Sequence, residues 1–318
     1  MKRRALIAAL AAGPLAGAAG RLHAQERSGR IIVGATPGGG TDLVARSLAT
    51  ELSARLQRQY IVDNRPGAGG NIAAGAVAKA EPDLATLLVC YTSHAINASL
   101  FAKLPFDPLK DFTPISLIAR SPLLLVTRPD FPAKDARELV ALGKSGRKLS
   151  IGVAGVGSAN HLAGEMLRRQ AGIEMISVPY KGAGPALADT MSGQVDLVFS
   201  NVASAQELVR GGRLKVLAVS TAARVPAFPN AAPVADLLPG FDYASWYGLL
   251  GPAGMKPADA ARVAAAVKAA VAGEAMRQQL TTEGLEPVGG TGPEFAAFLR
   301  QEIDRWRKVV IATGATVE

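Results

Sequence analysis

The sequence predicts a parallel α/β fold. Short apolar segments that are typical of buried strands alternate with amphipathic segments of helical length along most of the chain. Glycine-rich turns follow several of the apolar segments and precede helices, which is the order expected in strand–helix–strand units. Strands are expected at residues 31–33, 60–63, 86–91, 123–127, 150–153, 175–178, 195–199 and 214–219, and helices at 43–56, 72–79, 135–144, 161–170, 185–192, 203–210, 257–272 and 293–310.

The first turn has the composition of an anion site. It consists of Thr-Pro-Gly-Gly-Gly-Thr-Asp at residues 36–42, and in the helix after it an apolar residue recurs every four positions from Val44 to Leu56. Thr41 and Asp42 are suited to cap that helix, whose first N–H groups and positive dipole end attract anions. The turn lacks both the Gly-Lys-Ser/Thr ending of a phosphate-binding loop and the Gly-x-Gly-x-x-Gly pattern. The sequence therefore favours a carboxylate over a nucleotide phosphate.

Two further glycine turns lie in the middle of the chain. Residues 151–158 end in a turn where Gly155 and Gly157 allow close approach to a ligand, and either Ser158 or Asn160 can cap the next helix. The other turn spans residues 180–185. Because these turns lie over 100 residues beyond the first, we expect two lobes that face each other across a closing, solute-binding cleft. Lobe one is expected at residues 25–123 and 244–318, and lobe two at residues 124–243.

Residues 1–24 have the features of a cleavable signal peptide. Three basic residues, from Lys2 to Arg4, precede an uncharged stretch rich in alanine and glycine at residues 5–20, and Leu-His-Ala before Gln25 forms a passable cleavage site. The stretch is too short and too weakly apolar for a membrane span, which needs about 20 apolar residues. We therefore expect an exported protein whose mature chain begins at Gln25. The Arg3–Arg4 pair leaves both the twin-arginine and the general secretory routes open.

Charge and cysteine content exclude several classes of protein. The formal net charge of +9 falls to +5 without the four basic residues of the signal peptide, and the remaining basic residues are scattered, which argues against a nucleic-acid partner. The single cysteine, Cys90, excludes an intramolecular disulfide and a cysteine-based metal site, and its apolar neighbours predict a buried small hydrophobe. No cofactor and no metal are expected.

Six motifs, in order along the chain, resemble those of one receptor family. They are Pro-Gly-Gly-Gly-Thr-Asp at 37–42, Asn-Arg-Pro-Gly-Ala-Gly-Gly-Asn at 64–71, Gly-Ser at 157–158 with His-Leu at 161–162, Tyr-Lys-Gly at 180–182, Ser-Trp-Tyr-Gly-Leu at 245–249 and Pro-Ala-Gly at 252–254. The second of these motifs is highly specific. From about residue 31 to its end, the chain resembles the Bug-type periplasmic solute-binding receptors of the tripartite tricarboxylate transporter family.

The resemblance implies a Venus-flytrap, or periplasmic-binding-protein, fold: two α/β lobes, each a mostly parallel sheet flanked by helices, joined by two crossing strands. It also implies a small carboxylate ligand, held mainly by backbone amides, hydroxyls and bound water, and the membrane subunits of the transporter as partners. A monomer is expected. Dicarboxylates, citrate-like acids, aromatic acids and amino acids all remain open as ligands.

One departure from the family pattern lies at Leu84, where similar proteins usually have glycine. Leucine adopts a positive φ only at a cost in free energy. The turn at residues 82–86 is therefore expected to differ from that of the family.

Candidate ligand-binding residues come from the glycine turns and from the polar carboxyl ends of the strands. Thr41 is expected to face the ligand, whereas Asp42 would repel a carboxylate and is expected to cap its helix or to receive the amino group of an amino-acid ligand. Ser93 is favoured at the end of the third strand, and His161 is equally suited to ligand contact and to local capping. The full candidate set is Gly38, Gly39, Gly40, Thr41, Asp42, Thr92, Ser93, His94, Gly157, Ser158, His161, Tyr180, Lys181, Ser200 and Asn201.

The sequence argues against catalysis. Neither Ser158 nor Ser93 lies in a Gly-x-Ser-x-Gly elbow, and His94 and His161 are the two histidines left after removal of the signal peptide. Glu165 is placed one turn from His161 and could orient it, but no nucleophile stands at a suitable spacing. A binding protein is therefore expected. A ligand sensor for a membrane signalling protein, with the same fold and ligand, and a secreted hydrolase are the alternatives.

Overall fold

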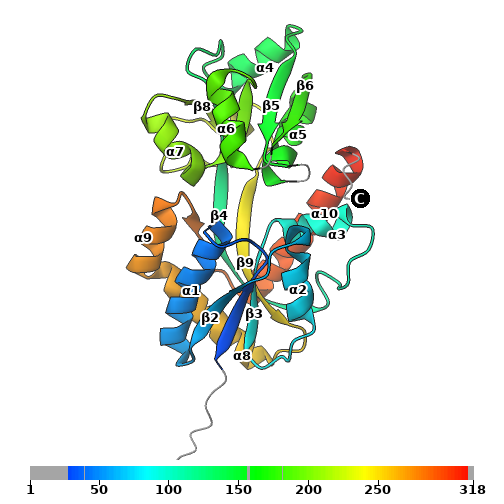
Figure 1. Cartoon of the computed structure of the whole chain (residues 1–318), viewed down its shortest axis with the longest axis vertical. Coiled ribbons are helices and arrows are strands. Elements are labelled where there is room, and N and C mark those ends of the chain that lie inside the picture. Colours follow the sequence, from blue (N-terminus) through cyan, green and yellow to red (C-terminus); the bar gives the residue numbers. More distant parts are fainter. Residues whose placement is uncertain (1–27, 39, 156–157, 181, 314–318) are drawn as a thin grey trace, which may run out of the picture.

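The chain folds into two α/β lobes. The computed structural model describes residues 28–38, 40–155, 158–180 and 182–313. The lobes follow each other along the long axis of the molecule, and two long strands, β4 (Phe112–Thr127) and β9 (Ala244–Pro252), run between them (Figure 1). The two-lobed α/β fold expected from the sequence is confirmed. The expectation of a mostly parallel sheet in each lobe is wrong, because the crossing strands pair antiparallel with their neighbours and make both sheets mixed.

Lobe one is built from segments at both ends of the chain. Its parallel strands, in the order β2-β1-β3, are β1 (Gly29–Val33), β2 (Tyr60–Asn64) and β3 (Thr86–Tyr91), and the antiparallel strands β9, β4 and β10 (Glu286–Pro287) extend this sheet. Its helices are α1 (Gly40–Leu56), α2 (Asn71–Ala78), α3 (Ser93–Leu100), α8 (Pro257–Ala272), α9 (Glu274–Thr282) and α10 (Gly292–Thr313). Side chains of β1 alternate between two cores: Ile31 packs with α1 and α8, and Ile32 packs with α2.

Lobe two has the same kind of sheet. Its parallel strands, in the order β7-β5-β6, are β5 (Leu149–Val153), β6 (Met175–Pro179) and β7 (Leu197–Asn201), and β4 and β8 (Lys215–Val219) complete it in antiparallel pairings. Its helices are α4 (Ala136–Lys144), α5 (Ala159–Ala171), α6 (Ala183–Ser192) and α7 (Val202–Arg210). Because β7 is the neighbour of β4, helix α7 begins beside the crossing strands.

Strand β4 passes from one sheet into the other. The part up to Pro122 pairs with β9 in lobe one, whereas the part from Leu123 onward pairs with β7 and β8 in lobe two. Ser220 closes this joint: its Oγ accepts a hydrogen bond from the Leu123 N–H at 2.9 Å and donates one to the Tyr243 carbonyl at 2.6 Å. The lobes therefore meet at a short, hydrogen-bonded crossing.

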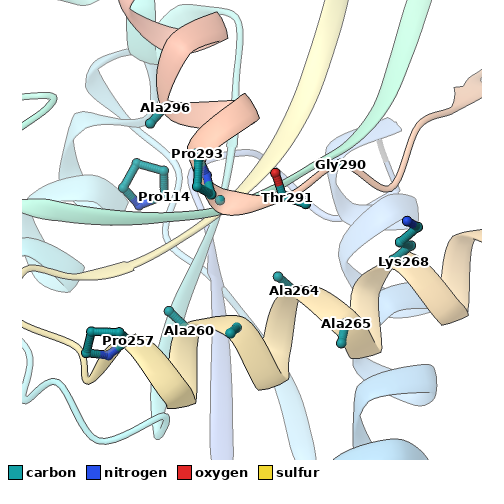
Figure 2. A pocket seen from close by; sticks show the side chains of 12 residues that line it. Pro114, Pro257, Ala260, Ala264, Ala265, Lys268, Gly290, Thr291, Pro293 and Ala296 are labelled. Carbon is teal, nitrogen blue, oxygen red and sulfur yellow. The ribbon is translucent and has the colours of Figure 1, made fainter.

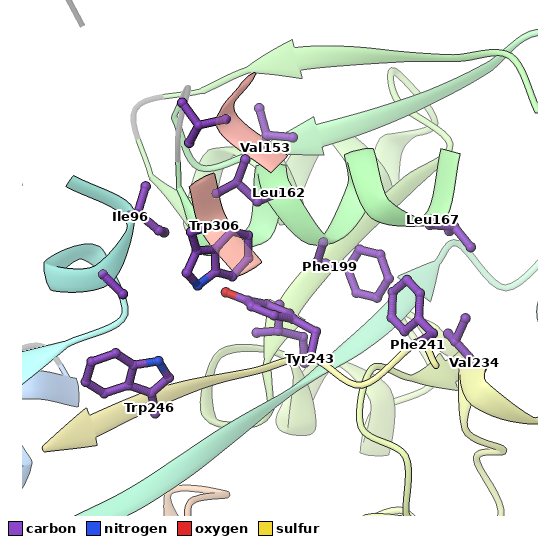
Figure 3. Close-up of a cluster of buried hydrophobic side chains, with 14 of the residues drawn as sticks. Ile96, Val153, Leu162, Leu167, Phe199, Val234, Phe241, Tyr243, Trp246 and Trp306 are labelled. Atoms are coloured by element: carbon purple, nitrogen blue, oxygen red, sulfur yellow. The ribbon is translucent and has the colours of Figure 1, made fainter. Parts of the chain in front are cut away.

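A buried aromatic cluster joins the lobes beside this crossing (Figure 3). Trp246 from β9 and Trp306 from α10 both donate their ring N–H to Oε2 of Glu302, at 2.9 and 3.1 Å. The Tyr243 ring packs edge-on against Trp306, with 5.2 Å between the ring centroids, and Phe199 of lobe two belongs to the same hydrophobic cluster. Helix α10, which begins in lobe one, therefore packs against both lobes.

Leu84 adopts the left-handed backbone conformation, with φ at 67°. The expectation that the turn at residues 82–86 would avoid this conformation is wrong. Left-handed φ costs a residue with a β-carbon about 1–2 kcal/mol. The Tyr60 hydroxyl donates a hydrogen bond to the Leu84 carbonyl at 3.0 Å, and the Leu84 side chain packs against the core of lobe one, so these contacts offset the strain.

Candidate functional site

Asp42 braces the turn between β1 and α1. Its Oδ2 accepts hydrogen bonds from the Gly38 N–H at 3.0 Å and from Arg46 Nε at 2.8 Å, and its Oδ1 accepts one from Asn64 Nδ2 at 2.9 Å. Burial raises the pKa of this carboxyl, but the hydrogen bonds and the Arg46 charge outweigh burial and lower the pKa to about 2. These donors all belong to lobe one, so Asp42 orders the start of α1 in the manner of a cap.

The N-terminus of α1 lies at the edge of lobe one that faces lobe two. Strand β1 leads to this edge and α1 runs back from it, so the first N–H groups of α1 point toward the space between the lobes (Figure 1). Gly40 is exposed there, and a β-carbon on it would lie 2.8 Å from the Tyr247 hydroxyl. Thr41, the next residue, is buried and 8 % exposed. Gly40 is thus the position at which a side chain would obstruct the helix end.

A cavity of about 270 Å³ lies between the lobes at this point. Five parts of the chain supply its walls: the start of α1, the start of α7, the two crossing strands β4 and β9, and the turn between α9 and β10. The lining residues are Gly38, Gly40, Leu43, Ser121, Asn201, Ala203, Ser204, Tyr247, Glu283 and Leu285. Two helix N-termini, each with N–H groups that have no partner within the helix, therefore converge on one cavity.

Asn201 ends β7 and lines this cavity. Its Oδ1 is buried, and no donor among the described residues reaches it. The preceding residue, Ser200, is fully buried and donates its hydroxyl hydrogen to the Asn201 carbonyl at 3.3 Å. A buried acceptor with no partner is rare in folded proteins, so Asn201 marks a place where a ligand or water donor fits.

Lobe two holds three further candidates among its described residues: Ser158, His161 and Tyr180. Ser158 caps α5, since its Oγ accepts a hydrogen bond from the His161 N–H at 3.3 Å. His161 is half-buried; burial lowers its pKa, and the charge of Glu165 opposes that effect. The Tyr180 hydroxyl donates to Asp189 at 2.7 Å, and burial together with that carboxylate raises the pKa of Tyr180 to about 12. The cavity lining formed by the described residues includes none of these three.

The candidates at the end of β3 lie at the start of α3. Thr92 Oγ1 accepts a hydrogen bond from the Trp246 N–H at 2.9 Å and so ties β3 to a crossing strand. Ser93, which is half-buried, begins the helix. The His94 ring packs between Phe106 and Phe112 in the core, and its Nε2 lies 3.0 Å from the Pro108 carbonyl oxygen. Burial lowers the pKa of His94 to about 4, against the effect of that carbonyl, so its ring is neutral at pH 7.

Three of the sequence candidates, Gly39, Gly157 and Lys181, lie outside the described residues. Of the others, Gly38, Gly40 and Asn201 come together at the cavity. Sequence reasoning did not nominate Glu283, which is half-buried in the wall and has neither an ion pair nor a side-chain hydrogen bond in the described part of the chain. No motif surrounds it, and its place in the wall comes from the position of α9 alone.

A larger groove, of about 590 Å³, lies on a different part of lobe one (Figure 2). Alanines of α8, the start of α10 and Pro114 line it, and Lys268 is the charged residue at its side. The Thr291 hydroxyl donates to Glu294 at 2.8 Å within the same segment. A lining of this kind offers few hydrogen-bond donors, so it suits a carboxylate less well than the smaller cavity does.

Within the ranges that the structure describes, each helix is too short or too polar to cross a lipid bilayer. In the same ranges, His, Cys, Asp and Glu side chains nowhere gather in threes or more as metal ligands would.

Comparison with known proteins identifies the family. Residues 44–315 match the family model of the tripartite tricarboxylate transporter family receptor. The protein BugT of Bordetella pertussis is 33% identical over 293 residues, which cover 91% of this chain and 90% of BugT. A protein encoded in the tcbD–tcbE intergenic region of a Pseudomonas species is 32% identical over 278 residues, covering 86% of this chain and 83% of that protein.

Solved structures agree with this match. The Rpa4515 protein of R. palustris, solved with adipate, has 33% sequence identity and a TM-score of 0.79, with 92% of this chain and 99% of that chain covered. The MatC protein of Rhodopseudomonas palustris, solved with bound malate, has 34% identity and a TM-score of 0.74, with 90% and 99% covered. The chain therefore belongs to the receptors of the tripartite tricarboxylate transporter family.

Proposed function

We propose that this receptor captures a small carboxylate between its lobes and delivers it unchanged to the membrane subunits of a tripartite tricarboxylate transporter. One observation carries the proposal: the N-termini of α1 and α7, from opposite lobes, line the same cavity of about 270 Å³. The adipate and malate held by the two solved relatives are acids of suitable size for such a cavity.

Capture would rely on N–H groups and hydroxyls. Arg and Lys are missing from the cavity lining that the described residues form, whereas Ser121, Ser204 and Tyr247 place hydroxyls there. Hydrogen bonds from backbone N–H groups to a carboxylate are stronger than those between neutral groups, and they strengthen further when closure excludes water. A ligand that contacts both lobes stabilises the closed arrangement over an open one.

The boundaries and the location of the protein form part of the proposal. We place the signal peptide at residues 1–24, lobe one at 25–123 and 244–318, and lobe two at 124–243. The change of partner along β4 between Pro122 and Leu123, and the start of β9 at Ala244, support these limits. Membership of a family of periplasmic receptors supports export to the periplasm, and the mature chain is proposed to act as a monomer.

Thermal unfolding of the mature chain from Gln25 in the presence of mono-, di- and tricarboxylates, aromatic acids and amino acids tests the proposal. A ligand at 100 times its Kd adds roughly 2.7 kcal/mol to the free energy of unfolding. Gly40→Ala is expected to abolish this gain, because its β-carbon meets the Tyr247 hydroxyl at the helix end. Gly75→Ala, in α2, is the matched control, since a β-carbon there makes only ordinary contacts of 3.8 Å.

The proposal fails if no acid raises the unfolding temperature, or if Gly40→Ala responds to the acid as the wild type does. Recovery of the acid in chemically unchanged form after prolonged incubation checks the absence of turnover.

A further inference from the structure

Glu283 gives one wall of the cavity a negative charge. It is the acidic residue among the described lining residues, and no Lys, Arg or His of the described chain forms an ion pair with it. The backbone N–H of Glu283 donates a hydrogen bond to the Gln279 carbonyl, but its side chain makes no hydrogen bond to the described residues. An anion in this cavity would meet an uncompensated carboxylate.

The helix that carries Glu283 reinforces this charge. Glu283 is the C-terminal cap of α9, with φ at −81° and ψ at 7°. The C-terminus of a helix has a negative partial charge, and it stabilises nearby cations while it disfavours anions. A glutamate at this position opposes the dipole of its own helix.

The helix starts that line the cavity have the reverse polarity. The N-termini of α1 (17 residues) and α7 (9 residues) line the same cavity at Gly40 and at Ala203. Helix N-termini have a positive partial charge and free N–H donors. The cavity therefore combines the positive polarity of two helix starts with the negative charge of Glu283, and the start of α7 adjoins Glu283 because Val202 packs on Gly284.

A zwitterion matches a cavity with two polarities. Its carboxylate fits the helix starts, and its protonated amino group fits Glu283; the Asn201 Oδ1, an acceptor without a donor in the described structure, offers the same amino group a second partner. A simple dicarboxylate can accept hydrogen bonds from the helix starts, but it offers no donor to Glu283 and is repelled by that carboxylate.

We propose that Glu283 selects ligands that carry an ammonium group beside the carboxylate, so that an amino acid binds more tightly than the acid that lacks its amino group. This inference rests on the proposed capture of carboxylates and narrows the class of acid.

Three pairs of acids that differ by the amino group alone test the inference: propionate and β-alanine, succinate and aspartate, and glutarate and glutamate. Calorimetric titration of the mature chain is expected to show that, in at least one pair, the amino member binds about tenfold or more tightly than its partner. Glu283→Gln is expected to remove this preference. Glu274→Gln is the matched control on the same helix, since the Glu274 side chain is 73% exposed and pairs with Arg277 outside the cavity.

A second variant keeps the test independent of the glutamine substitution. Glu283→Lys is expected to reverse the preference in favour of the acid without the amino group, and an unfolding curve confirms that each variant folds.

Equal binding of the two members of every pair by the wild type, or a preference that persists in Glu283→Gln, overturns the role of Glu283 while carboxylate capture stands. If none of the six acids, nor any acid of the wider screen, binds the folded wild type, the proposed function itself fails and this inference fails with it.

Discussion

Gly284 packs directly on Val202: a β-carbon on the glycine would overlap the valine side chain. Gly284 follows α9 in lobe one, and Val202 is the first residue of α7 in lobe two. Beside this contact, Gln206 Nε2 donates a hydrogen bond to the Thr282 carbonyl at 3.2 Å. The lobes thus touch here as well as at β4, β9 and α10, and this contact lies directly next to the wall that Glu283 contributes to the cavity.

Gly284→Ala is expected to lower the free energy of unfolding by about 2–5 kcal/mol. The φ of 68° costs a residue with a β-carbon about 1–2 kcal/mol, and overlap with Val202 adds about 1–3 kcal/mol. Gly254→Ala separates the two effects, because Gly254 has a φ of 81° but nothing within 4 Å of a β-carbon. Urea unfolding measures both variants, and equal losses would show that the contact with Val202 contributes nothing.

Removal of the carboxylate that both tryptophans share is expected to destabilise the protein by at least about 2 kcal/mol. Glu302→Leu leaves two buried indole N–H groups unpaired, and each such group costs about 1–3 kcal/mol. Glu302→Gln should lose less, since its side-chain carbonyl still accepts a hydrogen bond. Asp304→Ala, on the same helix with a 63% exposed side chain, should change stability by less than about 0.5 kcal/mol. Wild-type stability of Glu302→Leu in urea would contradict this role.

Stability is expected to fall between pH 6.5 and pH 4 because of His94. Burial keeps the folded-state pKa of His94 near 4, below the ordinary value of 6.5, so in this range the unfolded chain binds a proton that the folded chain does not bind. The loss approaches about 3 kcal/mol by pH 4 and levels off within about one pH unit below that. His94→Gln should have a flatter profile across this window in urea unfolding at several pH values. The same slope in the variant would show that other groups cause the loss.

Below pH 4, stability is expected to fall further because of Asp42. Its folded-state pKa of about 2 lies below the ordinary value of 3.8, so its contribution to stability is present above pH 4 and disappears as the pH falls through 2. The contribution amounts to about 2 kcal/mol. Asp42→Asn should already lack it at pH 5, and the difference in stability between the two proteins should narrow toward pH 2. A constant difference would refute the assignment to the Asp42 carboxyl.

Elements with a strong local pattern are predicted well from the sequence. Strand β3 (Thr86–Tyr91) and helix α8 (Pro257–Ala272) have the expected limits, because a continuous apolar run marks the first and a proline at the helix start marks the second. Cys90 is buried, as its apolar neighbours predict. The first half of β4 is not predicted, since Pro114 and Pro122 make it resemble a loop; the register shifts next to Pro114.

The cavity is harder to predict because tertiary structure assembles it. The turn before α1 is recognisable from its glycines, whereas the start of α7, which lines the described cavity with it, has no glycine turn before it. The sheet order brings α7 to this place, because β7 lies next to β4 and β5 lies one strand further away. Helix α9 has just Met276 and Leu280 as buried residues, so its pattern is weak and the position of Glu283 after it has no sequence signal.

The two tryptophans of the chain, Trp246 and Trp306, are both fully buried at the joint between the lobes. Their ring N–H groups share one carboxylate oxygen, and they belong to two elements, β9 and α10. Tyr243, the last residue of lobe two, packs edge-on against Trp306 of lobe one. Rotation of one lobe against the other therefore changes the surroundings of that indole, and no indole elsewhere in the sequence contributes background emission. The protein therefore contains its own fluorescent reporter of lobe movement, and closure around a ligand can be followed in the unlabelled wild-type chain.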